Sequence, residues 1–280
     1  MRTDTASPGQ DADAQSTWTA PDASATTMRA VDRALGVLCA FSRETPALGV
    51  TELSERLNLT KSTVHRLLQV LLARGMVARE PEHRRYMLGY RIVALAQAVP
   101  GEATLRQISR PHMLELRSVT QETISLYVTA GDVRFCLEEF ESPQMLRMGA
   151  GLGRCLPLGR GAAGKVLLID TTEQDELWRR VTADMPAVER AQLALALADI
   201  RAHGYCATSN ETVEGAASIA AAIRDRRGHV VAALSIAGPD SRFKHEVREQ
   251  FASLLLEAGE RITHDLAIAS SEQANGEVAR

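Results

Sequence analysis

The segment VTELSERLNLTKSTVHRLL, residues 50–68, decides the fold of the first part of the chain. Thr51 is suited to cap a short helix, because a hydroxyl can accept a hydrogen bond from a backbone N–H of the first turn. Asn58 and Leu59 interrupt that helix, and the hydroxyl of Thr60 can cap the next one. The segment therefore predicts two helices separated by a tight turn.

The second of these helices has one apolar face and one polar face. At 100° per residue the apolar residues fall within about 100° of one another; they are Val64, Leu67, Leu68 and Leu71. The remaining surface carries polar and hydrogen-bonding side chains, namely Lys61, Ser62, Thr63, His65, Arg66 and Gln69. Gly75 is expected to end the helix, since glycine readily adopts the left-handed conformation of a helix C-terminus.

The flanking sequence completes a winged helix-turn-helix over residues 28–89. Apolar residues recur at helical spacing over 28–41, before Pro46, and predict a first helix. Residues 76–79 and 84–88 read as two short strands around a turn at 80–83.

This architecture suits DNA binding. The major groove admits a helix, and Ser, Thr, Gln and Arg side chains can reach base edges there. On the wing, Arg84 and Arg85 are suited to phosphate or minor-groove contacts. The alternative is a three-helix module whose polar face is only solvated.

The charge distribution agrees with a nucleic-acid partner for this part alone. Residues 28–99 contain eleven Arg and Lys against six Asp and Glu, whereas the net charge of all 280 residues is −3. A basic module attached to an acidic remainder is expected when only that module meets DNA.

Length and composition exclude several classes. At about 100–200 residues per domain, 280 residues predict two domains. No apolar run approaches the roughly 18 residues of a membrane span, and no signal peptide opens the chain. The four cysteines lie far apart without a CxxC pair, so we expect a reduced, cytoplasmic protein without a disulfide framework or a zinc finger.

Three segments lie outside the two domains. Residues 1–27 contain no Leu, Ile or Val, and we predict a disordered tail. Residues 90–102 predict an apolar linker helix that packs on a partner helix, most simply one of a second subunit. Residues 269–280 are expected to form a flexible tail.

Residues 103–268 predict an α+β domain with an antiparallel sheet covered by helices. The expected strands are 124–128, 133–137, 146–148, 205–208, 218–223 and 230–236, and the expected helices are 105–119, 162–169, 172–181, 188–203 and 243–266.

A glycine-rich segment at Gly159–Lys165 imitates part of a phosphate-binding loop. Val166 stands where the loop requires a hydroxyl to hold magnesium, which argues against nucleotide hydrolysis. The helix start could still receive an anion, with Arg160 adding positive charge, so a carboxylate ligand suits this position. The alternative is that Arg160 is an ordinary surface arginine.

Nothing in the sequence indicates catalysis. No spacing suggests a Ser/His/Asp set, and the seven histidines are scattered. His203 and Cys206 have a spacing that metal ligands can use, but a packed strand entry explains the pair more simply. We therefore predict no catalytic residue, no metal and no cofactor.

With these residues in view, the chain resembles the IclR family of bacterial transcriptional regulators over about residues 28–268. The N-terminal similarity lies in 50–68, in LARGMV at 72–77 and in YMLG at 86–89. The C-terminal similarity lies in Leu-Pro-Leu at 156–158 with Gly-Lys at 164–165, in Gly-Tyr at 204–205, in Glu-Gly at 214–215, in Ala-Ala at 220–221, and in SIAGP at 235–239. The resemblance implies a winged-helix domain joined by a linker helix to a GAF-like effector-binding domain. It also implies dimers or tetramers that bind palindromic operators near metabolic genes.

The resemblance also implies positions for a small organic acid effector. They are Leu158, Thr208, Ala216, Ser218, Ser235 and Ala237. The chain departs from the family at Gly159-Arg160-Gly161, where His-Ala-Thr is frequent, and at Ala237, where some members carry Ser. Glu211 and Glu214 resemble an acidic patch beside the pocket that could order the loop instead of touching the ligand.

The sequence therefore predicts a ligand-responsive transcription factor that is not an enzyme. The resemblance favours a repressor, because repression is more frequent in this family. The alternative is an enzyme or a metabolite-binding module with an accessory basic helical domain.

Overall fold

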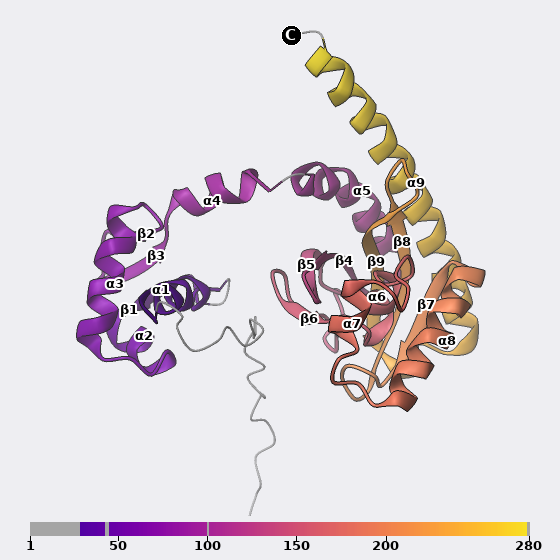
Figure 1. Ribbon diagram of the computed structural model, residues 1–280, viewed down its shortest axis with the longest axis horizontal. Helices are drawn as coiled ribbons and strands as arrows, with labels where there is room; N and C mark the ends of the chain where they lie inside the picture. The colour runs from indigo at the N-terminus through magenta and orange to yellow at the C-terminus, as the bar shows by residue number, and fades with distance from the viewer. Residues whose placement is uncertain (1–28, 43–44, 100, 279–280) are drawn as a thin grey trace, which may run out of the picture. The chain divides into compact units, whose positions relative to one another are not determined.

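The computed structural model describes residues 29–42, 45–99 and 101–278 (Figure 1). The described chain forms two compact units that divide between residues 103 and 104. The prediction of a disordered tail over 1–27 lies outside the described residues.

Three helices build the N-terminal unit: α1 (Arg29–Cys39), α2 (Val50–Arg56) and α3 (Lys61–Ala73). Their apolar faces meet in one small core. Its fully buried members are Val37, Leu48, Leu53, Val64 and Leu68. Because the apolar face of α3 is used in this core, the polar face is left toward solvent.

The helix ends follow the sequence in two places and differ in one. The Thr60 hydroxyl accepts the backbone N–H of Thr63 at 3.3 Å, which confirms Thr60 as the cap of α3. Gly75 has a φ of +69° just beyond α3, as expected for a helix stop. The prediction that Thr51 caps α2 is wrong. The cap is Gly49, whose backbone N–H donates to the Glu52 carboxylate at 2.6 Å.

The wing has three strands, in the order β1–β3–β2. The two predicted strands are present as β2 (Val77–Arg79) and β3 (Arg85–Leu88). The third, β1 (Ala47–Gly49), pairs with β3 and was not predicted. A strand of three residues offers almost no alternation to recognise, and its pairing partner lies about forty residues further along the chain.

The predicted linker helix over 90–102 is shorter in the structure. α4 runs over Tyr90–Gln97, and α5 (Glu102–Thr120) begins after a break. Before α4, the Gly89 N–H donates to the Met76 carbonyl at 2.8 Å, so Gly89 lies directly against the segment that follows α3.

The C-terminal unit contains a six-stranded antiparallel sheet in the order β6–β5–β4–β9–β8–β7. Its strands are β4 (Thr123–Ala130), β5 (Val133–Phe140), β6 (Cys155–Pro157), β7 (Tyr205–Ser209), β8 (Ala216–Arg224) and β9 (Val230–Pro239). The predicted α+β class with an antiparallel sheet is confirmed.

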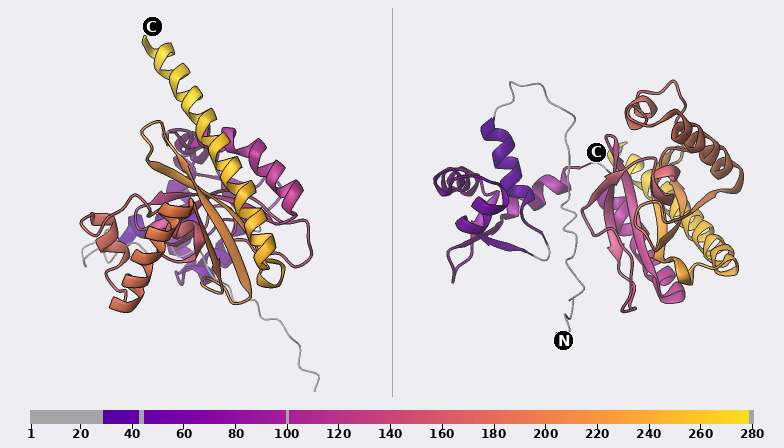
Figure 2. Two further views of the ribbon diagram at one scale, coloured as in Figure 1. Left: turned by 90° about the vertical axis from the view of Figure 1, so that its right-hand side faces the viewer. Right: turned by 90° about the horizontal axis from the view of Figure 1, so that it is seen from below.

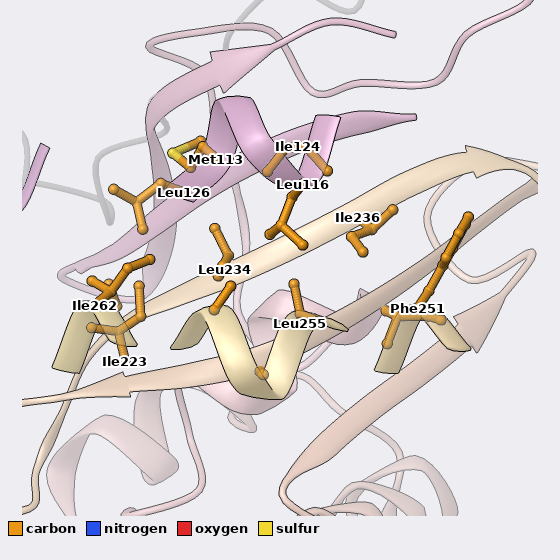
Figure 3. Close-up of a cluster of buried hydrophobic side chains, with 14 of the residues drawn as sticks. Met113, Leu116, Ile124, Leu126, Ile223, Leu234, Ile236, Phe251, Leu255 and Ile262 are labelled. Atoms are coloured by element: carbon orange, nitrogen blue, oxygen red, sulfur yellow. The ribbon is translucent and has the colours of Figure 1, made fainter. Parts of the chain in front are cut away.

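Helices cover both faces of this sheet (Figures 1 and 2). On one face α5 and α9 (His245–Val278) close a core that includes Leu126, Leu234, Ile236 and Leu255 (Figure 3). On the other face a second core joins the sheet to α6 (Gly161–Val166), α7 (Glu176–Val181) and α8 (Ala187–His203). Alternate residues of each strand are therefore buried on opposite sides.

A predicted strand and a predicted helix start in this unit differ from the structure. Residues 146–148 form no strand, and the edge position beside β5 is taken by Cys155–Pro157. The helix expected from Thr172 begins at Glu176, because the Thr172 N–H and hydroxyl donate to Asp175 and close a turn.

The last helix begins later and ends later than predicted. It starts at His245, because the preceding Asp240–Arg242 turn places Phe243 in the core. The helix continues to Val278, through most of the segment 269–280 for which a flexible tail is predicted. No helix within the described ranges is long and apolar enough to cross a membrane.

Two glycines of the N-terminal unit should respond oppositely to alanine. A Cβ at Gly36, inside α1, makes ordinary contact with Leu57 at 3.6 Å, whereas one at Gly89 overlaps the Gly75 backbone. Gly36→Ala should raise the unit's free energy of unfolding by about 0.5–1 kcal/mol, and Gly89→Ala should lower it by roughly 1–3 kcal/mol. Calorimetry of the full chain measures both, and equal effects of the two variants would contradict the close packing at Gly89.

Candidate functional site

The polar face of α3 is the first candidate site. The side chains of Lys61, Ser62, His65, Arg66 and Gln69 are exposed, and Thr63 is half-buried. Val64 and Leu68 pack into the core, and this fixes the polar face of α3 on the solvent side. The sequence-predicted residues of α3 therefore lie together on one surface of the unit.

Ser62 and Thr63 are partly committed to the helix start. The Thr60 hydroxyl lies 3.1 Å from that of Ser62 and 2.9 Å from that of Thr63. These contacts order the first turn of α3. The longer side chains of Arg66 and Gln69, one and two turns further on, are exposed and make no such contact with any residue that the structure describes.

The three wing arginines have different surroundings. Arg79 stacks over the Tyr86 ring at 5.6 Å, and the Nη2 of Arg85 donates to Glu52 Oε1 at 2.8 Å. Arg84 is exposed at the tip and has no side-chain partner within the described residues. Of the two predicted phosphate contacts, Arg84 is thus available as it stands, whereas Arg85 is tied to α2.

The predicted effector residues converge on one face of the sheet. Thr208 pairs with Ser218, Ser218 with Ala237, and Ala237 with Thr123, so these four residues form a row across β7, β8, β9 and β4. Ser235 and Ala216 lie two residues along their strands and point to the same side. The Thr208 and Ser218 hydroxyls are 3.1 Å apart and bond to each other.

Leu158 lies in the core on this same side of the sheet. It is buried with Ala162, Ala163 and residues of α8. The structure therefore brings Leu158 and the strand residues to one face, as the resemblance implies. Arg160 does not belong to this core.

A polar crevice of about 260 Å³ opens beside the row at Thr123. It is lined by Thr123, Glu139, Glu141, Arg147, Gly149, Ala150, Gly151 and Arg154. Glu139 organises the crevice, since its carboxylate accepts the Ser125 hydroxyl at 2.9 Å and the N–H groups of Ala150 and Gly151 at 3.0 Å each.

The sequence analysis missed the residues of this crevice. The adjacent carboxylates Glu138 and Glu139, near the end of β5, were the signal that could have indicated Glu139. The role of Arg154 and of the segment 147–151 depends on how the loop folds back over the sheet, for which the sequence offered no pattern.

Arg160 does not reach into the sheet. Its side chain is 62% exposed and lies 3.6 Å from the Glu189 carboxylate on α8. The buried cation of this region is Arg134 of β5, which is 5% exposed. Its Nη1 donates to the carbonyl oxygen of Arg160, and its guanidinium stacks on the Tyr127 ring at 5.3 Å. Burial lowers the pKa of Arg134.

Glu211 occupies the start of α6. Its Oε2 accepts the Gly161 N–H at 3.0 Å, and its Oε1 lies 2.5 Å from Nζ of Lys165. The helix start is predicted to receive an anion through its backbone N–H groups, and one of these, that of Gly161, is already bonded to a carboxylate of the chain. Both Glu211 and Glu214 are exposed, but Glu211 also bonds to the start of α6 and so orders this loop.

A larger surface cavity of about 560 Å³ lies between the α6–α7 connection and α8. It is lined by Ile169, Asp170, Thr171, Thr172, Glu173, Trp178, Ala194, Leu197 and Arg201. None of the sequence-predicted effector residues is among them.

The buried thiols are poor nucleophiles. Burial raises the pKa of Cys136 and raises that of Cys206 to about 12, so both are protonated at neutral pH. The described residues also contain no cluster of three His, Cys, Asp or Glu that could hold a metal ion.

Known proteins agree with this arrangement. Residues 30–81 match the IclR helix-turn-helix domain, and residues 97–264 match the C-terminal domain of the bacterial transcriptional regulator IclR. The HTH-type transcriptional regulator KdgR of Escherichia coli is 32% identical over 82% of this chain and 90% of its own. The HTH-type transcriptional repressor AllR of Salmonella typhimurium is 31% identical over 78% of this chain and 82% of its own.

A solved structure shows the same fold with a ligand. The crystal structure of an IclR homolog from Microbacterium hydrocarbonoxydans, complexed with 4-hydroxybenzoate, has a TM-score of 0.72. It is 26% identical and covers 85% of this chain and 98% of its own.

The fold and the matched family models define a DNA-binding transcriptional regulator. The chain belongs to the IclR family of bacterial transcriptional regulators.

The contacts of Glu52 predict an acid dependence of the N-terminal unit. The hydrogen bond from the Gly49 N–H and the Arg85 guanidinium lower the pKa of Glu52. The stability that they contribute is present above the ordinary carboxyl pKa and is lost as the pH falls through the lower, folded-state value. Glu52→Gln should therefore make unfolding less pH-dependent below about pH 4.5.

Thermal unfolding of the full chain between pH 6 and pH 3 measures this effect. Glu55→Gln, on the exposed side of the same helix, is the matched control. Parallel pH profiles for wild type and Glu52→Gln would show that these contacts do not stabilise the folded unit.

Proposed function

We propose that this protein is a cytoplasmic repressor of a metabolic operon, which binds a palindromic operator as a homodimer or tetramer and responds to a small organic acid. The observation that carries the proposal is the α3 surface, where an apolar stripe is buried and a polar, cationic face is exposed. We propose repression because the relative AllR is named a transcriptional repressor and because repression is the more frequent activity in the family; no feature of the fold carries this part of the proposal.

The proposed DNA contacts come from α3 and the wing. Arg66 and Gln69 are long enough to reach base edges. The proposed contacts nearer the helix start are Lys61, Ser62, Thr63 and His65. Arg84 supplies phosphate affinity from the wing tip, since it is exposed and unpaired within the described residues.

The proposed effector site lies between the 156–164 loop and the row formed by Thr208, Ser218 and Ala237. Three features support it. Buried hydroxyls of Thr208 and Ser235 offer hydrogen bonds, Leu158 offers apolar contact, and the crevice at Thr123 opens beside them. A homolog that binds 4-hydroxybenzoate makes a carboxylate ligand the first class to test.

The proposed subunit contact is α4. No residue of this helix is buried, although all but Arg91 and Gln97 are apolar: Tyr90 is 92% exposed, and Val93 and Leu95 are about half exposed. Covering these side chains with a second subunit also explains how two recognition helices would meet the two halves of a palindrome.

Replacement of Arg66 tests the DNA proposal. Arg66→Ala should cost about 1–3 kcal/mol on the operator and relax the preference at one base position, because a base contact is lost. Arg84→Ala should instead weaken binding to all sequences and reduce the slope of log affinity against log salt by about 0.9. Titrations of operator and random DNA at several salt concentrations compare the two, and equal losses on both DNAs for Arg66→Ala would remove α3 from sequence reading.

Charge placed on α4 tests the dimer. Val93→Glu should produce monomers at micromolar concentration and weaken operator binding, because a buried, unpaired carboxylate opposes the subunit contact. Leu195→Glu, at an exposed leucine of α8, is the matched control and should remain a dimer. Sedimentation velocity gives the result, and a wild-type monomer that still binds the operator tightly would contradict the proposal.

A further inference from the structure

One large apolar side chain of α3, Val70, lies outside the apolar stripe of that helix. It is 62% exposed, whereas Val64, Leu68 and Leu71 of the stripe are buried. At 100° per residue, Val70 points about 110° away from the middle of the stripe. None of the other large apolar side chains of α1, α2 and α3, helices that the structure describes in full, is as exposed. Val70 therefore does not belong to the core of the N-terminal unit.

Helix stability does not explain a valine at this exposed position. A β-branched side chain loses rotamer freedom in a helix, so valine forms helices less readily than alanine or lysine. An exposed isopropyl group also stays in contact with water and gains nothing from burial. The side chain of Val70 becomes favourable only when another apolar surface covers it.

Two arginines flank Val70 along the helix. Arg66 precedes it and Arg74 follows it by four residues, so the three side chains form a row at intervals of about 6 Å. Both arginines are exposed, and neither forms an ion pair with any residue that the structure describes. α3 itself contains no Asp or Glu. The row therefore fits a surface that offers an apolar group between two regions of negative charge.

The major groove of DNA is such a surface. Thymine presents its apolar C5-methyl group there, beside the acceptor atoms of neighbouring bases, and phosphates line both edges of the groove. A second copy of this helix would bring only further cations to Arg66 and Arg74, because α3 has no carboxylate. The row therefore favours DNA over the same helix of a second subunit as the surface that covers Val70.

We propose that Val70 reads sequence by packing its isopropyl group on the C5-methyl group of a thymine, with Arg66 and Arg74 on either side of this contact. This inference rests on the proposed DNA contacts of α3 and adds the base that one position of each half-site must carry. The hydrogen-bonding side chains of α3 cannot replace Val70 in this role, since a methyl group is recognised by apolar contact.

Deoxyuridine, which lacks the C5-methyl group of thymidine, tests this contact directly. A palindromic duplex is selected from a randomised library with the full-length wild type, and the thymines of one half-site are replaced by uracil one at a time. One replacement should weaken wild-type binding about fourfold, because one buried methyl group is lost. Val70→Ala should bind the thymine and uracil duplexes equally well. Its melting temperature should equal or exceed that of wild type, since alanine is the better helix former.

The matched control is Val31→Ala, the same change at an exposed valine of α1, which should keep the preference for thymine. A wild-type affinity that no uracil replacement lowers would overturn the inference, and so would a preference for thymine that Val70→Ala retains. A Val70→Ala variant that becomes monomeric in sedimentation velocity would overturn it as well and make Val70 a subunit contact.

Arg66→Ala keeps this inference apart from the proposed function. If that variant loses sequence preference as expected while no uracil replacement has an effect, Val70 is removed from the contact and α3 remains the reading helix. A wild type that selects no duplex from the library would contradict both proposals.

Discussion

Burial of the six-stranded sheet on both faces is the constraint on which the C-terminal unit depends. Helices α5 and α9 take up one set of alternate side chains, and α6, α7 and α8 take up the other. A hydroxyl or carboxylate on such a strand has no water to bond to, so it must find a partner within the fold. The Thr208 and Ser218 hydroxyls satisfy this condition by bonding to each other, and the carboxylate of Glu139 does so through the Ser125 hydroxyl and two loop amides. The candidate effector face is the place where the second core changes from apolar to polar.

The N-terminal unit follows the same physical rule on a smaller scale. The stripe of Val64 and Leu68 orients α3, and the polar part of the helix surface faces solvent because it is not needed for packing. Three short strands then fix the wing, with Glu52 joining the start of α2 to Arg85 of β3. The contact with Glu52 thus occupies the Arg85 guanidinium, whereas the Arg84 side chain is exposed and has no partner within the described residues.

Two arginines near α6, Arg160 and Arg134, differ in their burial. Arg160 is the departure from the family that the sequence makes conspicuous, but it lies at the surface beside Glu189. Arg134 looks like an ordinary residue of an alternating strand, yet it is the cation buried beneath the glycine-rich loop. Gly161 and Gly164 permit this approach, since a side chain at either would meet the guanidinium.

The sequence by itself determined the elements whose signals are local. The Thr60 cap, the α3 stripe, the Gly75 stop, the β4–β5 hairpin and the antiparallel α+β class could all be predicted, because neighbouring residues carry periodicity and capping chemistry. The resemblance to the IclR family added the candidate effector residues, which lie on three different strands apart from Leu158. Only the tertiary structure decided the short strands β1 and β6, the pairing of Arg85 with Glu52, the crevice at Glu139 and the contact of Glu211 with Lys165. Each of these joins side chains far apart in sequence, or depends on a loop folding over the sheet, and no local pattern encodes such a meeting.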